Sequence, residues 1–355
     1  MELFESVMWK YIREEQEILS SNIERTDIEE LAETVKNFNH VVFVSHGSSF
    51  NSSETVSFFY NKYAHMNVTC VTSGNFIATE NMVSLLDPKD TFVITISQTG
   101  NSRGTLLSAQ LAKKYHLTTV GISTDKNAVL ADYVDYLLPL NCGEEDSNAK
   151  TKGMSSTILV LLLLGAAIGK KKKILSSQLQ EEIKQELREQ CLELKEVFNK
   201  SVEFCRINDF GKGVSNFYIT GSGMNYGLAL EAQIKLMETM CITTCAVDTE
   251  EFSHGTHRSI DKNTHLLILK TQENKVLAQK TFDYFEPKTN VYMIETFEEN
   301  SNEKVVQVKQ HPHTQSVLTI VEFIQIISAY GPENNHLDPN RESNNEFTEI
   351  VETRI

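Results

Sequence analysis

Residues 40–49 read HVVFVSHGSS, and residues 216–225 read NFYITGSGMN. Each stretch is an apolar run rich in β-branched or aromatic residues. Each ends in a turn of glycine and serine, and a helical pattern follows. Continuously apolar strands are typical of a parallel sheet whose two faces are covered by helices. Because one stretch opens each half of the 355-residue chain, the pair predicts an internal duplication of one α/β domain.

The rest of the chain repeats this alternation of strand and helix. We expect the remaining strands over residues 67–73, 91–97, 117–122, 136–140, 242–247, 265–269 and 290–294, and a last helix over 315–329. Strands that alternate with helices form parallel sheets wound on both sides. The predicted fold is therefore α/β, with two tandem doubly wound parallel-sheet domains and a C-terminal tail.

Composition shifts along the chain suggest the domain boundaries. We expect an N-terminal helix over 1–30, a first domain over 31–170, a helical linker over 171–200, a second domain over 201–330 and a polar tail over 331–355.

The composition excludes several classes of function. A net charge of −15 and a pI near 5.2 argue against nucleic acid and an anionic membrane surface, which basic proteins bind. The apolar run Ile158–Ile168 is shorter than the roughly 20 residues that cross a bilayer, so we expect a buried helix. The six cysteines form no CxxC pair, and the charged N-terminus lacks a signal-peptide pattern. These features predict a cytoplasmic protein with reduced thiols.

Two loops after predicted strands carry residue types that bind phosphate. One is the turn after the strand at 40–45, and the other is SQTGNS at 97–102. Helix N-termini at strand ends offer unpaired N–H groups, and hydroxyls add further donors. The predicted binding residues are Gly47, Ser48, Ser49, Ser97, Gln98, Thr99 and Ser102. The alternative is that these residues only cap helices and form turns.

Neither loop fits a nucleotide-binding pattern. The P-loop pattern GxxxxGK(S/T) is absent from both loops. The turn Gly221-Ser222-Gly223 is only a fragment of GxGxxG, since Tyr226 stands where the third glycine belongs. We therefore expect no cofactor. A nucleotide-binding protein, the reading we disfavour, would be protected against melting by a dinucleotide.

The predicted helix after the second turn carries Glu231, Lys235 and Glu238 at positions i, i+4 and i+7. This spacing places all three on one face. Because the helix follows the turn at 221–225, its first turns should lie beside the edge of the sheet where ligands bind. The alternative is an ordinary solvated ion pair.

The segment DTEEFSHGTH at 248–257 adds two histidines. The group Glu250, Glu251, His254 and His257 lacks a recognised metal-ligand spacing, so we expect no metal there. We expect a structural or loop role for His257.

The SQTGNS loop and the repeated strand-turn-helix resemble the sugar isomerase (SIS) domain family, which binds phosphosugars at this type of loop. Two such flavodoxin-like domains in one chain are the architecture of the isomerase half of glucosamine-6-phosphate synthase. They also form the fructosamine and glucoselysine phosphate deglycases and the aminosugar-phosphate deaminase/isomerases. The resemblance covers roughly residues 30 to 330 and implies a phosphorylated sugar or aminosugar as substrate.

The helix LALEAQIKLME at 228–238 resembles the corresponding helix of the synthase. On that resemblance Glu238 is the base that moves a proton between sugar C1 and C2, and Glu231 and Lys235 orient the substrate and balance charge. Proton transfer beside a carbonyl suits a glutamate whose pKa burial has raised. His254 would open the sugar ring, which needs a group that donates and accepts protons near pH 7. In the family's homodimers this histidine reaches the neighbouring subunit's site. Thr256 replaces the family's proline.

Two differences from the synthase sequence narrow the range of reactions that we expect. A glutaminase domain like that of the synthase has no counterpart in this sequence. The synthase's tail lysine, which forms a Schiff base, is also missing: the last lysine is Lys309, and Asn345 lies near the expected position. A substrate that already carries an amine can form a protonated imine without an enzyme lysine.

We therefore expect a deglycase or deaminase/isomerase acting on an amino-linked hexose 6-phosphate. The alternative is a non-catalytic regulator that binds a phosphosugar. A regulator would not need Glu238, Lys235 and His254 together.

Overall fold

The computed structural model describes residues 3–297, 301–344 and 346–354. Asn345, the residue nearest the expected tail lysine, lies outside the described residues.

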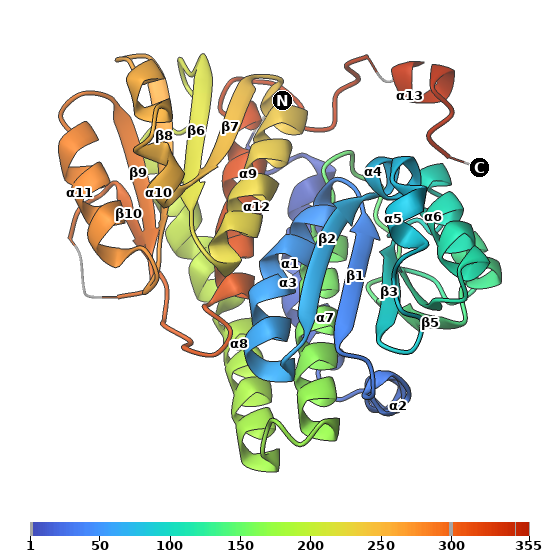
Figure 1. The fold of residues 1–355 in the computed structure, drawn as a ribbon. Coiled ribbons are helices and arrows are strands. Elements are labelled where there is room, and N and C mark those ends of the chain that lie inside the picture. Colours follow the sequence, from blue (N-terminus) through green and yellow to red (C-terminus); the bar gives the residue numbers. More distant parts are fainter. Residues whose placement is uncertain (1–2, 298–300, 345, 355) are drawn as a thin grey trace. The chain divides into compact units, whose positions relative to one another are not determined.

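Two five-stranded parallel sheets form the framework (Figure 1). The first contains β1 (His40–Ser45), β2 (Asn67–Thr72), β3 (Thr91–Ile96), β4 (Thr118–Ser123) and β5 (Tyr136–Pro139), in the order β2-β1-β3-β4-β5. The second contains β6 (Asn216–Gly221), β7 (Thr243–Asp248), β8 (Thr264–Lys270), β9 (Asn290–Glu295) and β10 (Val305–Gln307), in the order β10-β9-β8-β6-β7. Counted within its own half, each sheet has the order 2-1-3-4-5 of flavodoxin-like folds. The predicted fold class and duplication are confirmed.

Helices flank both sheets. The helices up to the end of the first domain are α1 (Val7–Ser21), α2 (Thr26–Val35), α3 (Ser48–Ala64), α4 (Ser73–Ala78), α5 (Glu80–Val83), α6 (Arg103–Lys114) and α7 (Lys152–Lys171). The later helices are α8 (Ser177–Ile207), α9 (Met224–Met240), α10 (Thr249–Phe252), α11 (Lys275–Phe285), α12 (Val317–Glu333) and α13 (Glu346–Ile350). The turns that open the two halves are equivalent. Gly47 (φ 57) begins α3 and Gly223 (φ 60) begins α9, both in a backbone region that glycine adopts readily.

The chain forms two compact units. One contains the second sheet and consists of Met1–Glu17, Asp146–Lys152 and Glu186–Arg341. The other contains the first sheet and consists of Ile18–Glu145, Gly153–Gln185 and Glu342–Ile355. The predicted linker over 171–200 is thus shared between the units, and so is α1.

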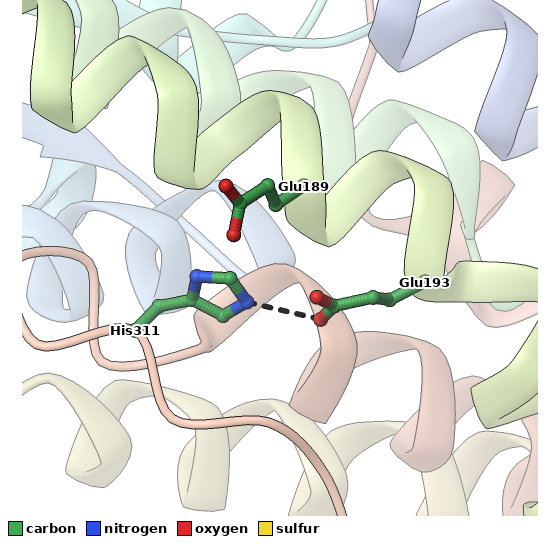
Figure 2. A group of neighbouring side chains, drawn as sticks. All are labelled: Glu189, Glu193 and His311. Carbon is green, nitrogen blue, oxygen red and sulfur yellow. Dashed lines mark hydrogen bonds and ion pairs between the residues drawn. The ribbon is translucent and has the colours of Figure 1, made fainter.

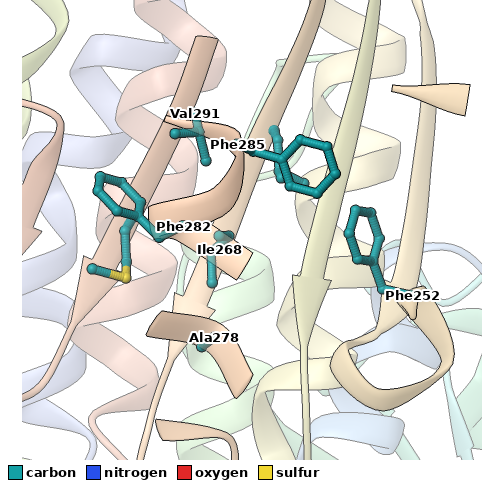
Figure 3. Packing of buried hydrophobic residues seen from close by; sticks show 8 residues of the cluster. Phe252, Ile268, Ala278, Phe282, Phe285 and Val291 are labelled. Atoms are coloured by element: carbon teal, nitrogen blue, oxygen red, sulfur yellow. The ribbon is translucent and has the colours of Figure 1, made fainter. Parts of the chain in front are cut away.

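A hydrophobic cluster fixes α10 and α11 on the second sheet. Figure 3 shows Phe252 of α10, Phe282 and Phe285 of α11, and Ile268 of β8 in this cluster. All of them are buried, and burying a side chain of this size contributes about 1.5–3 kcal/mol.

The long apolar run lies in α7, as expected. By length and composition this helix could cross a membrane, but its whole apolar window is buried inside the structure. Such burial is typical of a core helix.

Candidate functional site

The two predicted phosphate-binding loops leave neighbouring strands. β1 and β3 pair in parallel, so their carboxyl ends lie at the same edge of the sheet. Gly47 turns β1 into α3, whose first turn contains Ser48 and Ser49. Ser97–Ser102 connects β3 to α6. Two helix N-termini therefore begin at this edge, each with unpaired N–H groups in its first turn.

The SQTGNS loop is organised around Ser97, which is 4% exposed. Its hydroxyl donates to Ser102 Oγ (3.1 Å) and accepts from the N–H of Gly100 (3.1 Å). Thr99 lies at the exposed tip and donates to Asn101 Oδ1 (2.6 Å). Ser97 and Ser102 thus shape the loop as well as offering oxygens to a ligand.

Gln98 has an unpaired amide donor. Its Nε2 is buried and has no hydrogen-bond partner among the described residues. The side chain lies against Gly153 at the start of α7, where a Cβ would come within 2.9 Å of the Gln98 amide. A buried donor without a partner is costly, and a bound ligand oxygen or a water would satisfy it.

The end of β2 reaches the same edge, which sequence reasoning missed. Ser73 was assigned to the strand, but it begins α4, and its buried hydroxyl has no partner within the described chain. A Cβ on Gly104 would come within 3.2 Å of Ser73 and 3.0 Å of the His46 ring. The serine-glycine pair at 73–74 is typical of a turn and could have indicated that the strand ends before Ser73.

The C-terminal tail lies against the same loop. Ser102 forms an antiparallel bridge with Arg354, and the Arg103 N–H donates to the Thr353 carbonyl (3.1 Å). The tail therefore occupies one first-turn N–H of α6.

The second group of predicted residues lies on α9. Glu231 and Lys235 form an ion pair of 2.8 Å, and both side chains are 0% exposed. Lys235 Nζ also donates to the Lys150 carbonyl. The alternative of a solvated surface pair is therefore wrong, because neither partner reaches solvent.

Glu238 lies one turn further along α9. Its pKa is raised to about 7: desolvation is the largest cause and Glu231 adds to it, while the charges of Lys235 and Lys150 act in the opposite direction. The Glu238 side chain is nevertheless exposed to solvent, which counteracts desolvation. Glu238 has the environment of a base that works near neutral pH.

His254 is exposed in the turn after α10, and it is not among the groups that shift the pKa of Glu238. His257 lies close by, with its Nδ1 3.3 Å from the Phe252 carbonyl.

One group in the described part of the chain has the spacing of a metal site. Figure 2 shows His311 facing Glu189 and Glu193 of α8, with all three ligand atoms within 4.8 Å of one another. His311 Nε2 lies 2.9 Å from Glu193, and Lys309 Nζ lies 2.5 Å from Glu189 and 3.5 Å from Glu193. These cationic and hydrogen-bonding partners explain the cluster as a polar network that fixes the segment before α12 to α8.

Comparisons with known proteins agree with this architecture. Residues 35–167 match the SIS domain family model. The glutamine–fructose-6-phosphate aminotransferase (isomerizing) of Clostridium tetani is 25% identical over 262 residues, which cover 72% of this chain and 41% of that protein. The chain thus spans about four-tenths of the length of that relative, and a second relative gives a similar share of 38%.

Two solved structures cover nearly the whole chain. A candidate phosphosugar isomerase of Clostridium difficile 630 matches with a TM-score of 0.89 and 27% identity, over 98% of this chain and 99% of that one. The C-terminal domain of glucosamine-fructose-6-phosphate aminotransferase from Francisella tularensis matches with a TM-score of 0.85 and 20% identity, over 96% and 99%. At that identity the second match supports the fold alone. An SIS domain is thus matched at residues 35–167, and the second sheet has the same strand order as the first.

Proposed function

We propose that this protein is a phosphosugar enzyme of the deglycase or deaminase/isomerase type, acting on an amino-linked hexose 6-phosphate. The observation that carries the proposal is Glu238, a carboxylate beside a buried ion pair, with a pKa raised to about 7. A group that only binds a sugar has no need of a base tuned toward neutrality. The relatives named for fructose 6-phosphate support a hexose 6-phosphate as the substrate.

In the proposed reaction the loops after β1 and β3 hold the phosphate group. Ser48, Ser49, Ser97, Thr99 and Ser102 supply hydroxyls there, Gln98 its unpaired amide, and Gly47 the turn that opens α3. His254 passes a proton between the hydroxyl of the anomeric carbon and the ring oxygen as the sugar opens.

Glu238 then takes a proton from one of the carbons C1 and C2 and returns it to the other, which leaves an imine. Water adds across the C=N bond, and the C–N bond breaks as the amine leaves with its electron pair and a proton. The Glu231–Lys235 pair keeps the helix charge balanced beside the open-chain sugar.

We further propose that the enzyme works in the cytoplasm as a homodimer in which His254 serves the neighbouring subunit's site. The exposure of His254 in the single chain supports this arrangement.

The test is a panel of fructosamine, glucosamine and glucoselysine 6-phosphates, scored for released amine and for exchange of the C1 or C2 proton with deuterated water. The proposal predicts amine release from at least one compound. Clear binding without exchange or release from any compound would instead identify a regulator.

A further inference from the structure

A cavity of about 290 Å³ lies among the helices α1, α8 and α12. All of its lining residues belong to the compact unit that contains the second sheet. The volume is close to the lower end of the range for ligand pockets, which suits a small molecule. The proposed function assigns no role to any residue of these three helices, so the cavity is a candidate for a second site.

Glu322 is the buried acid among the lining residues. It lies in the middle of α12, every residue of which is buried, and it is itself 2% exposed. Its Oε2 forms no hydrogen bond with any described residue. Desolvation and the charge of Glu15 raise the pKa of this carboxyl. A buried carboxyl oxygen without a partner is costly, and a ligand that donates a hydrogen bond to it would recover that free energy.

Two exposed cations, Arg13 of α1 and Lys195 of α8, also line the cavity. Neither forms an ion pair with another residue of the described chain, although the net charge of −15 supplies many carboxylates. The Arg13 guanidinium lies over the Phe198 ring, 5.5 Å from its centroid, and Phe198 is a lining residue as well. This pair of cations is therefore suited to a carboxylate or another small anionic group.

Ile12, Leu194 and Phe198 give the cavity an apolar wall. A complementary ligand has an ammonium group that donates to Glu322, an anionic group for the two cations, and an apolar part for this wall. The ammonium charge also favours the ionised form of Glu322, which offsets the desolvation that favours the neutral form. A sugar fits less well, because the apolar wall leaves its hydroxyls without partners.

We propose that this cavity is a binding site for a small apolar α-amino acid, with the ammonium group beside Glu322 and the carboxylate beside Arg13 and Lys195. The site goes beyond the proposed function and does not depend on it, because none of its residues takes part in the proposed reaction.

The test is calorimetric titration of the whole chain with L-valine, L-leucine and L-methionine. We expect saturable binding of at least one of them, with one molecule per chain. Two analogues of the tightest ligand are then compared with it: the carboxylic acid that lacks only the amino group, and the amide that lacks the carboxylate. Each should bind about tenfold more weakly or worse, because each loses a charge-assisted hydrogen bond. A cavity that takes up only water would show no such discrimination.

Variants assign the two ends of the ligand. Glu322→Gln should weaken binding about tenfold or more and reduce the difference between the amino acid and its deaminated acid. Its melting temperature should not fall, because glutamine resembles the neutral carboxyl that burial favours. Arg13→Met combined with Lys195→Met should reduce the difference between the amino acid and its amide.

Glu203→Gln and Arg206→Met, which change an exposed ion pair of α8, are the matched controls and should leave every affinity unchanged. Glu238→Gln and Ser97→Ala should also leave the affinity for the amino acid unchanged, which separates this cavity from the proposed active site.

Three results would overturn the inference. The first is that none of the three amino acids binds at concentrations up to about 10 mM. The second is binding that Glu322→Gln and the double variant leave unchanged, or that Glu238→Gln or Ser97→Ala abolishes. The third is a change of oligomeric state in the double variant without amino acid binding by wild type, which would identify the cavity as part of an interface between copies of the chain.

Discussion

At the scale of single residues, the raised pKa of Glu238 links the stability of the fold to pH. Its pKa is raised from 4.5 to about 7 by desolvation and by the charge of Glu231, although the side chain is exposed. The stability linked to such a group is fully present below the unfolded pKa near 4.5 and is lost as the pH rises toward 7. At neutral pH the folded chain therefore holds an ionised group that it would hold more easily neutral. A general base that accepts a proton at neutral pH works best with a pKa near 7.

Replacing Glu238 by glutamine should therefore separate activity from stability. We expect Glu238→Gln to lower kcat by about 10²- to 10⁴-fold, the usual contribution of a general base, with little loss of substrate binding. Its melting temperature should exceed that of wild type at pH 8 and approach it near pH 4.5, because glutamine resembles the protonated carboxyl. Glu196→Gln, at an exposed glutamate of α8, is the control for both measurements. Turnover above a few percent of wild type would show that another group is the base.

For the proposed phosphate-binding loop Ser97–Ser102 we expect a different effect, because its contacts with the phosphate group would be the same in the ground state and in the transition state. Ser97→Ala removes a hydroxyl that joins Ser102 and Gly100. We expect KM to rise about tenfold with kcat nearly unchanged, as for the loss of uniform binding. Steady-state kinetics of the variant beside Ser84→Ala, at an exposed serine of the same unit, would check this. A fall in kcat at constant KM would place Ser97 in the chemistry instead.

The sequence predicted some of these residue positions and missed others. The i, i+4, i+7 spacing of Glu231, Lys235 and Glu238 predicted from local sequence alone that the three residues share one helix face, and in the structure Glu231 and Lys235 shift the pKa of Glu238. The position of Lys150 beside α9 could not be predicted from the sequence, because it depends on a hydrogen bond to Lys235, which is 85 positions away. Spacing along a chain contains no information about such a contact.

At the scale of elements, α9 combines a strand-to-helix turn with a buried ion pair. Taking two charges out of water is costly, and the mutual attraction of Glu231 and Lys235 offsets that cost only while both are present. The pair therefore ties the integrity of the helix to the site that it carries.

A double-mutant cycle on this pair should show strong coupling. Lys235→Met alone should destabilise the protein by about 3–5 kcal/mol, because it leaves the Glu231 carboxylate buried and uncompensated. Glu231→Gln combined with Lys235→Met should cost clearly less than the sum of the single changes. Urea unfolding at pH 7 measures the three free energies of unfolding, and Lys212→Met on the exposed pair with Asp209 serves as control. Additive effects would mean that the two charges do not stabilise one another.

Elements with a long or strongly apolar pattern were predictable, and short ones were not. β1 was predicted residue for residue, whereas β10, three residues long, was missed because three residues cannot show a period. The last helix begins at Val317 and continues to Glu333 through Pro332, although glycine and proline suggested an earlier end. Tertiary burial of every residue of this helix outweighs the local signal.

At the scale of the whole molecule, the two duplicated halves differ at the carboxyl ends of their sheet strands. β3 and β8 pair in the same register with the first strand of their sheets, so Lys270 occupies the position of Ser97. Lys270 is buried and donates to Glu295 (2.6 Å) and Gln279 (2.6 Å). An internal ion pair thus fills the edge of the second sheet where the first sheet offers hydroxyls and an unpaired amide.

His254 is exposed, and it is not among the groups that shift the pKa of Glu238. If it serves the neighbouring subunit, two inactive variants should complement each other. Glu238→Gln and His254→Asn are each expected to be inactive. In a mixed dimer, the site with Glu238 from one chain and His254 from the other is intact, while the second site lacks both.

Random pairing makes half of the dimers mixed, each with one intact site of two, so about a quarter of wild-type activity should return. Differently tagged chains, copurified in tandem after coexpression, allow activity per mixed dimer to be measured, with sedimentation confirming the dimer. The matched control pairs Glu238→Gln with Lys235→Met, two changes in the same half-site, and should restore nothing. If the mixed Glu238→Gln and His254→Asn dimers also stay inactive while both variants fold, His254 does not serve the neighbouring subunit's site.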